Sequence, residues 1–324
     1  MIASNDRIMK PPYELTSNIV RKITTVSELI GEINAYHLDK PSPTLRKANQ
    51  IRTIHSSLSI EGNTLSEKQI TAIVENKMVI GPEKDILEVK NAIKIYQSLD
   101  QFRADSKQSF LKAHKILMKG LIDAPGTYRT TGVGIMKGSE VQHMAPPASR
   151  VPALMNDLFD YLKSDEISLI KSCVFHYEME FIHPFMDGNG RMGRFWQTII
   201  LTNEYPIFQY IPFETIVSKT QETYYAALRE SDKAGDSTPF ILYMMGVLEK
   251  ALAELLHKGR KQLDDIQRLK YFIDKGGTSF TRKDYMKVFK NISSATATRD
   301  LKKGLDLGLL KKEGEGNQSR YMVL

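Results

Sequence analysis

The sequence has very little cysteine and no long apolar segment. Its one cysteine, Cys173, excludes an intrachain disulfide and is typical of a reducing compartment. The longest apolar run, 240–248, has nine residues and includes a glycine, whereas a membrane-spanning helix needs roughly 20 residues. Residues 1–16 lack the charged and apolar parts of a secretory signal. We therefore expect a soluble, cytoplasmic protein without membrane attachment.

A P-loop motif, G-x-x-x-x-G-K-[ST], is also missing, which excludes that mode of phosphate binding. The rest of the composition is ordinary. The chain has 324 residues, of which 41% are hydrophobic and 26% are charged, so we expect two or three globular domains. Its net charge of +7 is compatible with nucleic acid or with nucleotide phosphates and decides nothing alone.

Helical periodicity predominates along the chain. Apolar side chains recur at helical spacing in 51–58, 170–181 and 192–200, and Gly62 is typical of a helix stop. One stretch, 130–147, is instead rich in glycine and β-branched residues, contains a turn and ends in two prolines. It predicts a short β-hairpin. The fold class is therefore mainly α with a small hairpin.

A separate unit is predicted at the C-terminal end. Thr281 and Asp284 resemble a capping box, Ser293 or Ser294 can begin a second helix, and 310–324 form a hairpin. This order is typical of a winged helix. Residues 281–324 hold ten Lys or Arg and five Asp or Glu. DNA and a protein partner both stay open, and DNA is not favoured because few arginines lie on the second helix.

The strongest chemical signal is the segment 183–194, HPFMDGNGRMGR. The spacing predicts a tight loop at Gly188–Gly190 between two helices. Its backbone N–H groups can form an anion cradle at the N-terminus of the second helix. Arg191 and Arg194 project from the first turn of that helix, and two guanidinium groups beside such a cradle suit a polyphosphate.

Two more side chains in this segment point to phosphate and proton chemistry. Asp187 precedes the cradle, and a carboxylate among phosphates usually marks a Mg²⁺ site. His183 lies four residues earlier and can take a proton from an attacking hydroxyl. Any one of these residues alone is more often structural. Their combination at this spacing favours a nucleotide site over a plain helix-loop-helix.

The segment resembles the signature of the Fic family, H-x-F-x-[DE]-G-N-G-R-x-x-R, at every specified position. The hairpin has the position of the Fic flap, and SLSIEG at 57–62 resembles the inhibitory motif [ST]-x-x-x-E-[GN]. The resemblance implies a Fic-type helical bundle with a hairpin flap and a C-terminal winged-helix domain. It also implies three parts, which are an N-terminal helical region (1–105, inhibitory helix 44–62), a Fic core (106–262) and a winged-helix domain (263–324).

This resemblance implies a protein adenylyltransferase, which transfers AMP from ATP to a Ser, Thr or Tyr hydroxyl of a target protein, itself included. His183 would be the general base, and Asp187 would hold the cofactor Mg²⁺. Phe185 would lock the loop into the core. The phosphate contacts would come from Gly188, Asn189 and Gly190 as the anion hole, Arg191 for the leaving phosphates and Arg194 for the γ-phosphate.

The resemblance implies two further parts of an ATP site. Tyr224, of the pair Tyr224–Tyr225, would line the adenine pocket, with core packing as the alternative. Some relatives have an asparagine eight residues later, where this chain has Asp232. Flap residues Ile135 and Met136 would cover the nucleotide and align the target segment by strand-like pairing.

Glu61 lies at the C-terminal end of a predicted helix, where a negative charge is disfavoured by ~0.3–1 kcal/mol. A nearby cation is therefore expected. The resemblance implies that Glu61 pairs with Arg194, removes the γ-phosphate contact and keeps the resting enzyme slow. Ser57 would bond within the same helix end and hold Glu61 in place.

Two alternative functions stay open. An AMP-removing hydrolase would use the same site, with Glu61 helping to activate water. A DNA-binding regulator would use the Fic module as a nucleotide sensor, but the intact His183 favours an enzyme because a sensor needs no base. A homodimer also stays open.

Overall fold

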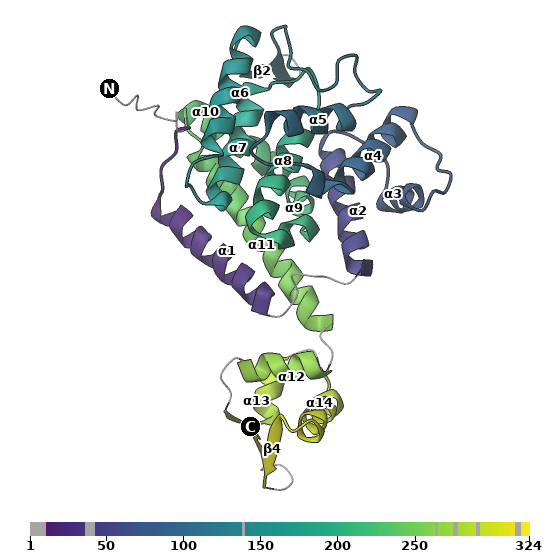
Figure 1. Ribbon diagram of the computed structural model, residues 1–324, viewed down its shortest axis with the longest axis vertical. Coiled ribbons are helices and arrows are strands. Elements are labelled where there is room, and N and C mark those ends of the chain that lie inside the picture. Colours follow the sequence, from purple (N-terminus) through teal and green to yellow (C-terminus); the bar gives the residue numbers. More distant parts are fainter. Residues whose placement is uncertain are drawn as a thin grey trace. The chain divides into compact units, whose positions relative to one another are not determined.

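A computed structural model describes residues 11–35, 43–137, 140–262, 265–274, 278–289, 292–314 and 319–324. Contacts divide the chain into two units, one of residues 1–30 and 40–252 and one of residues 31–39 and 253–324. Helices predominate in both, which confirms the mainly α fold class (Figure 1). Within the described ranges, no helix has the length and apolarity needed to span a membrane.

The first unit contains most of the helices, of which α1 and α11 each end in residues that belong to the second unit. In chain order they are α1 (Ser17–Ala35), α2 (Pro43–Ile60), α3 (Glu67–Val74), α4 (Glu83–Tyr96), η1 (Leu99–Gln101), α5 (Lys107–Leu117), η2 (Ala148–Arg150), α6 (Val151–Tyr161), α7 (Ser168–Ile182), α8 (Asn189–Glu204), η3 (Pro206–Tyr210), α9 (Glu214–Lys219), α10 (Gln221–Ala234) and α11 (Thr238–Gln262). The predicted division at 105/106 falls inside this unit.

Helices α7 and α8 form the centre of this unit and lie side by side (Figure 1). Both are almost wholly buried, and Cys173 is a core residue of α7, as expected. An aromatic cluster fills the space toward α5, with ring centroids of Phe110 and Trp196 5.1 Å apart and those of Phe110 and Phe185 5.4 Å apart. Burial of such large side chains fixes the two helices that carry the signature segment.

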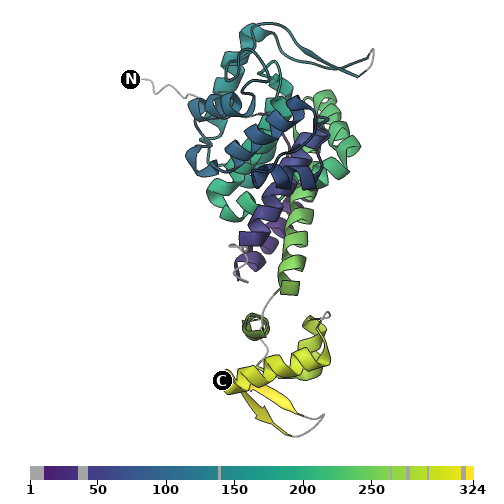
Figure 2. The same cartoon turned by 90° about the vertical axis from the view of Figure 1, so that its right-hand side faces the viewer.

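The predicted hairpin is confirmed as β1 (Gly134–Lys137) and β2 (Glu140–Met144), which pair antiparallel. The register shifts between Ile135 and Met136, which indicates a bulge. Its strands extend away from the helices (Figure 2). The turn at 138–139 and the side chains of Ile135 and Met136 lie outside the described part of the chain, so their nucleotide contact stays a prediction.

Helix α2 corresponds to the predicted inhibitory helix. It ends at Ile60, and Gly62 adopts a left-handed φ of 89°, as the helix stop requires. Polar contacts join α2 to the helices beside it: Ser56 Oγ donates to Thr215 Oγ1 at 3.1 Å, and Gln221 Nε2 donates to the Ile60 carbonyl at 2.9 Å. These contacts fix the end of α2 that carries Glu61.

The second unit contains α12 (Asp265–Asp274), β3 (Ser279–Thr281), α13 (Arg282–Val288), α14 (Ser294–Asp306), β4 (Leu310–Glu313) and β5 (Arg320–Val323). Two predicted caps are confirmed, the Thr281–Asp284 capping box and Ser293 at the start of α14. The sheet has the order β3-β5-β4. The sequence did not predict β3. The winged-helix assignment of this unit stays a prediction.

Candidate functional site

The signature loop joins α7 to α8 through an unusual backbone. His183 has a left-handed φ of 49°, which is costly for a residue with a side chain and therefore marks a constrained position. Asn189 closes the loop from inside: its amide accepts from the Phe185 N–H and donates to the Phe185 carbonyl, both at 2.9 Å. Asn189 is thus a clamp within the loop, and its backbone begins α8.

His183 occupies the end of α7 with a half-buried ring. Its Nδ1 lies 3.3 Å from the Glu180 carbonyl. A carbonyl only accepts, so this contact assigns the proton to Nδ1 and leaves Nε2 as the basic nitrogen. The ring therefore has the tautomer that a general base at Nε2 requires.

Phe185 and His114 pack together beneath the backbone of the signature loop, on its buried side. Their rings stack with centroids 3.6 Å apart and planes 5° apart. The Gly126 N–H donates to His114 Nδ1 at 2.8 Å, so His114 Nε2 carries the proton and donates to the Asp187 carbonyl at 3.0 Å. Burial lowers the pKa of His114 to about 4, which keeps the ring neutral. No sequence pattern singles out His114, because it lies 73 residues before Asp187.

Asp187 and Arg191 form a chain of charges with a carboxylate from another helix. Asp187 Oδ1 accepts from the Gly188 N–H at 2.6 Å and from Arg191 Nη2 at 3.0 Å. Arg191 Nη1 also contacts Glu88 Oε1 of α4 at 3.0 Å, in a pair that is almost wholly buried. Arg191 is thus fixed between two carboxylates. Glu88 was missed because nothing in the spacing of α4 singles it out.

Arg194 is completely buried and bonds to α2. Its Nη2 donates to Glu61 Oε1 at 2.7 Å and to the Ser57 carbonyl at 2.9 Å, while its Nε donates to Ser57 Oγ at 3.1 Å. Burial opposes the charge of Arg194, but Glu61, together with Tyr224 and Glu180, outweighs burial and raises the pKa of Arg194 above its ordinary value. The predicted contact between Glu61 and Arg194 is therefore present.

The predicted part played by Ser57 is corrected. We expected its hydroxyl to bond within the end of its own helix and hold Glu61. Instead the hydroxyl accepts from Arg194, because this face of α2 is turned toward α8. Ser57 therefore orients the guanidinium rather than the carboxylate.

The Glu61 carboxylate lies against the anion cradle. A Cβ added to Gly190 would be 2.5 Å from Glu61 Oε1 and 3.1 Å from Arg194 Nη1. A larger residue at this position would therefore displace the carboxylate from where it lies. An anion is favoured at the N-terminus of a helix, so Glu61 occupies a place that also suits a phosphate.

Three glycines of the segment, Gly188, Gly190 and Gly193, have the spacing of the dinucleotide fingerprint G-x-G-x-x-G. That fingerprint requires a preceding β-strand, whereas helix α7 precedes the loop here. Gly193 instead permits close packing of α7 and α8, since a Cβ there would be 2.7 Å from His176 Cδ2. The spacing therefore does not indicate a Rossmann site.

The structure places Tyr224 in the core. Its side chain is 1% exposed, and its hydroxyl lies 3.1 Å from His176 Nε2. The expectation that Tyr224 lines an adenine pocket therefore does not fit this arrangement, and core packing explains it. The neighbouring Tyr225 is 40% exposed, so its ring is the accessible one. Asp232 accepts from the Tyr177 hydroxyl at 3.0 Å.

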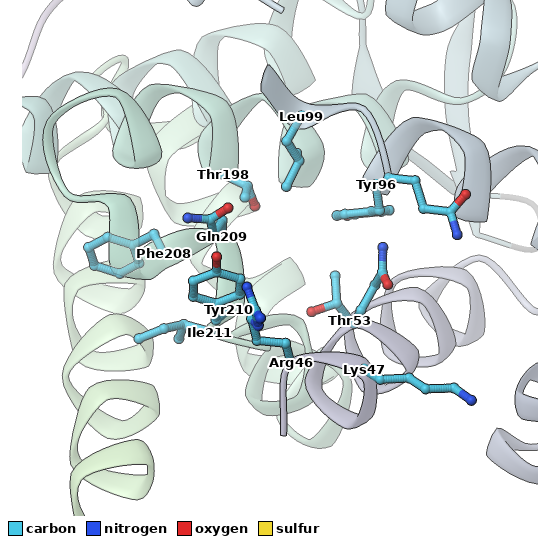
Figure 3. A pocket seen from close by; sticks show the side chains of 12 residues that line it. Arg46, Lys47, Thr53, Tyr96, Leu99, Thr198, Phe208, Gln209, Tyr210 and Ile211 are labelled. Carbon is cyan, nitrogen blue, oxygen red and sulfur yellow. The ribbon is translucent and has the colours of Figure 1, made fainter. Parts of the chain in front are cut away.

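A cavity of about 340 Å³ is lined by residues of α2, α4, η1, α8 and η3 (Figure 3). Arg46 and Lys47 of α2 lie at one side, and the Tyr96 and Tyr210 rings face it from two others. Lys47 is already paired with Glu75 at 2.9 Å, and Arg46 lies over the Tyr210 ring. The cavity contains no residue of the signature segment and is separate from the candidate site.

Comparison with known proteins identifies relatives along most of the chain. A family model described as the Fic/DOC family matches residues 105–201. A solved structure of a Fic family protein from Desulfovibrio desulfuricans G20 is 39% identical, covers 97% of this chain and 98% of its own, and has a TM-score of 0.75. The structure of Fic-1 (residues 134–508) from Caenorhabditis elegans is 22% identical, covers 75% of this chain and 74% of its own, has a TM-score of 0.62 and supports the fold alone.

Curated relatives carry a functional name. A protein from Nematostella vectensis named protein adenylyltransferase Fic is 26% identical over 269 residues, which are 78% of this chain and 58% of that protein. A protein from Drosophila grimshawi with the same name is 27% identical over 73% of this chain and 50% of its own length. The chain thus spans about half the length of these relatives.

Proposed function

Because the chain belongs to the Fic family, we propose that it is a protein adenylyltransferase, which transfers AMP from ATP to a hydroxyl side chain of a target protein. The observation that carries this proposal is the complete set of His183, Asp187, the Gly188–Gly190 cradle and two fixed arginines around one loop. A binding module that only senses nucleotide has no need of a histidine in the tautomer of a base.

The reaction follows from the groups around the loop. The target hydroxyl oxygen attacks the α-phosphorus of ATP, and its proton passes to His183 Nε2. The bond from the α-phosphorus to the bridging oxygen breaks, and pyrophosphate leaves with the electron pair of that bond. Charge develops on the phosphate oxygens, where the cradle and Arg191 provide donors that are already oriented.

Mg²⁺ fits this site as a cofactor held by one carboxylate together with ATP. The contacts of Asp187 with the Gly188 N–H and with Arg191 both use Oδ1, and its side chain is 47% exposed, so Oδ2 can serve as a ligand. Among the described residues, no group of three acidic, histidine or cysteine side chains could hold a metal without the phosphates. One carboxylate together with phosphate oxygens is a usual set of ligands for Mg²⁺, which would neutralise phosphate charge when bound.

We further propose that Glu61 inhibits this activity from within the chain. Arg194 has no exposed surface, and its Nη1 is buried without a hydrogen-bond partner among the described residues. A γ-phosphate that bonds to Arg194 must therefore displace Glu61, because the carboxylate holds Nη2 and lies over Gly190. In this account the exposed Tyr225, rather than Tyr224, contacts the adenine.

Labelled ATP tests the reaction class directly. We expect label from α-labelled ATP on the chain itself or on a protein in a lysate, in the presence of Mg²⁺, and no label from γ-labelled ATP. Transfer of the γ-label would indicate a kinase. Release of AMP from an already modified protein, without new labelling, would favour the hydrolase alternative. If neither wild type nor Glu61→Gly places either label on any protein, the proposed function is contradicted.

A further inference from the structure

Arg129 lies between α5 and β1 and is 3% exposed. Its guanidinium donates only to backbone carbonyls. The four acceptors are the carbonyls of His183 (2.7 Å), Ile182 (3.2 Å), Thr131 (2.9 Å) and Pro146 (2.5 Å). Its own N–H adds a fifth bond, to the Pro184 carbonyl at 2.9 Å.

These carbonyls belong to two parts of the fold that are far apart in sequence. Ile182 and His183 end α7 at the left-handed position of the signature loop. Thr131 precedes β1, and Pro146 follows β2. One side chain therefore joins both ends of the hairpin to the backbone of the histidine.

The electrostatics of this contact favour arginine specifically. A positive charge is stabilised at the C-terminus of a helix, where carbonyls lack partners. Burial lowers the pKa of Arg129, and none of the ion pairs found among the described residues includes it. A planar guanidinium can reach acceptors in several directions at once, whereas a lysine ammonium is a single compact head.

We propose that Arg129 is a positioning residue that fixes the hairpin relative to His183 and so brings the target hydroxyl to the base. This inference rests on the proposed function, since it assumes that a target segment pairs with the hairpin. Arg129 donates to none of the residues that we assign to the phosphates. Its loss should therefore affect the target hydroxyl and spare ATP.

The test is Arg129→Lys in the Glu61→Gly background, with Arg103→Lys, an exposed arginine beside Asp105, as the matched control. We expect the AMP transfer rate at saturating ATP to fall at least roughly tenfold, while ATP affinity changes by less than about twofold. Amide hydrogen exchange should accelerate at residues 129–146 and 182–184 and stay unchanged in α8. The control should match its parent in all three measurements.

Two results would overturn the inference: unchanged exchange at the hairpin ends and the loop, or an equal loss of ATP affinity and transfer. If the Glu61→Gly parent transfers no AMP, the proposed function fails, while exchange still decides the role of Arg129. If Arg129→Lys does not fold, amide hydrogen exchange in the wild-type protein tests the inference instead. The inference then predicts that the Arg129 and His183 amides exchange through one common opening, and independent exchange rates contradict it.

Discussion

The residues of the signature segment divide into those that hold the loop and those that face the ligand. Phe185 is fully buried, and Asn189 bonds to the backbone on both sides of it. His183 and Asp187 are more accessible, and both have one side fixed by a contact within the chain. This division indicates which substitutions test chemistry and which would only disturb the fold.

His183→Ala should abolish AMP transfer and leave ATP binding nearly intact, because the base acts on the incoming hydroxyl and not on the nucleotide. Both quantities are measured in one preparation, by labelling from α-labelled ATP and by calorimetric titration. Transfer within roughly tenfold of wild type would show that His183 is not the base.

Asp187→Asn should reduce the effect of Mg²⁺ on ATP affinity. The amide keeps the size of the side chain but removes the charge that a hard cation requires. ATP is titrated with and without Mg²⁺ in both proteins. A variant that retains the full Mg²⁺ effect would show that the metal is held elsewhere.

For single residues, the sequence predicts features within one segment well, and it predicts poorly which residues of other helices contact that segment. The residues of 183–194 follow one another, so their common location is implied by the spacing alone. Glu88 and His114 reach the same loop from α4 and α5, and no pattern within those helices distinguishes their inward faces from ordinary core positions. The same holds for Tyr224, whose burial depends on how α10 packs against α7 and α11.

At the scale of elements, α2 and α9 enclose a second carboxylate near Arg194. Glu214 begins α9 and is completely buried, with the Tyr96 hydroxyl 3.4 Å from its Oε1. Burial raises the pKa of Glu214 to about 8, although Arg194 acts in the opposite direction. The carboxyl is therefore mainly protonated at neutral pH, which leaves Glu61 as the anion that pairs with Arg194.

Glu214 should make the stability of the protein depend on pH. Its folded-state pKa of about 8 exceeds the ordinary value of 4.5. The folded state therefore binds more protons, and its advantage is complete below about pH 4.5 and is lost as the pH rises through about 8. The side chain of Glu214→Gln cannot titrate. The free energy of unfolding of the variant should therefore rise relative to that of wild type as the pH increases from about 5 to 9.

Urea unfolding followed by the fluorescence of Trp196, the single tryptophan, measures this difference in the unit that contains Glu214. Parallel stability curves for the two proteins across that pH range would contradict the assignment. Glu75→Gln, at an exposed ion pair with the opposite direction of pKa shift, serves as the control.

Most elements were predictable because their patterns are long or carry caps. Helices α2, α7 and α8 follow clear apolar periodicity, and the hairpin follows from its glycines, β-branched residues and prolines. Strand β3 has three residues and exists through pairing with β5, which lies some 40 residues later. Such a short strand has no periodicity of its own to read.

At the scale of the molecule, the two units separate within α11, after Leu252. All residues assigned to the candidate site lie in the first unit. A chain that ends at Gln262 keeps the whole of α11 and should bind ATP as the full chain does. Calorimetric titration of both proteins measures this. A folded truncation that no longer binds ATP would refute the division, whereas loss of target labelling alone would indicate that the second unit docks the target.

Under the proposed inhibition, a carboxylate from α2 competes with ATP for Arg194. Hydrogen bonds to charged groups contribute ~1.5–3 kcal/mol, and ~1.4 kcal/mol corresponds to a factor of ten in rate. Removal of Glu61 should therefore raise AMP transfer roughly 10- to 100-fold. The gain should require Arg194, because residues that act through one contact are energetically coupled.

The most direct test is the rate of labelling from α-labelled ATP in four proteins: wild type, Glu61→Gly, Glu61→Gly with Arg194→Ala, and the control Glu67→Gly at an exposed glutamate nearby. We expect activation in Glu61→Gly, loss of most of that gain in the double variant and no change in the control. Unchanged or slower transfer by a well-folded Glu61→Gly protein, or activation that survives the loss of Arg194, would contradict it.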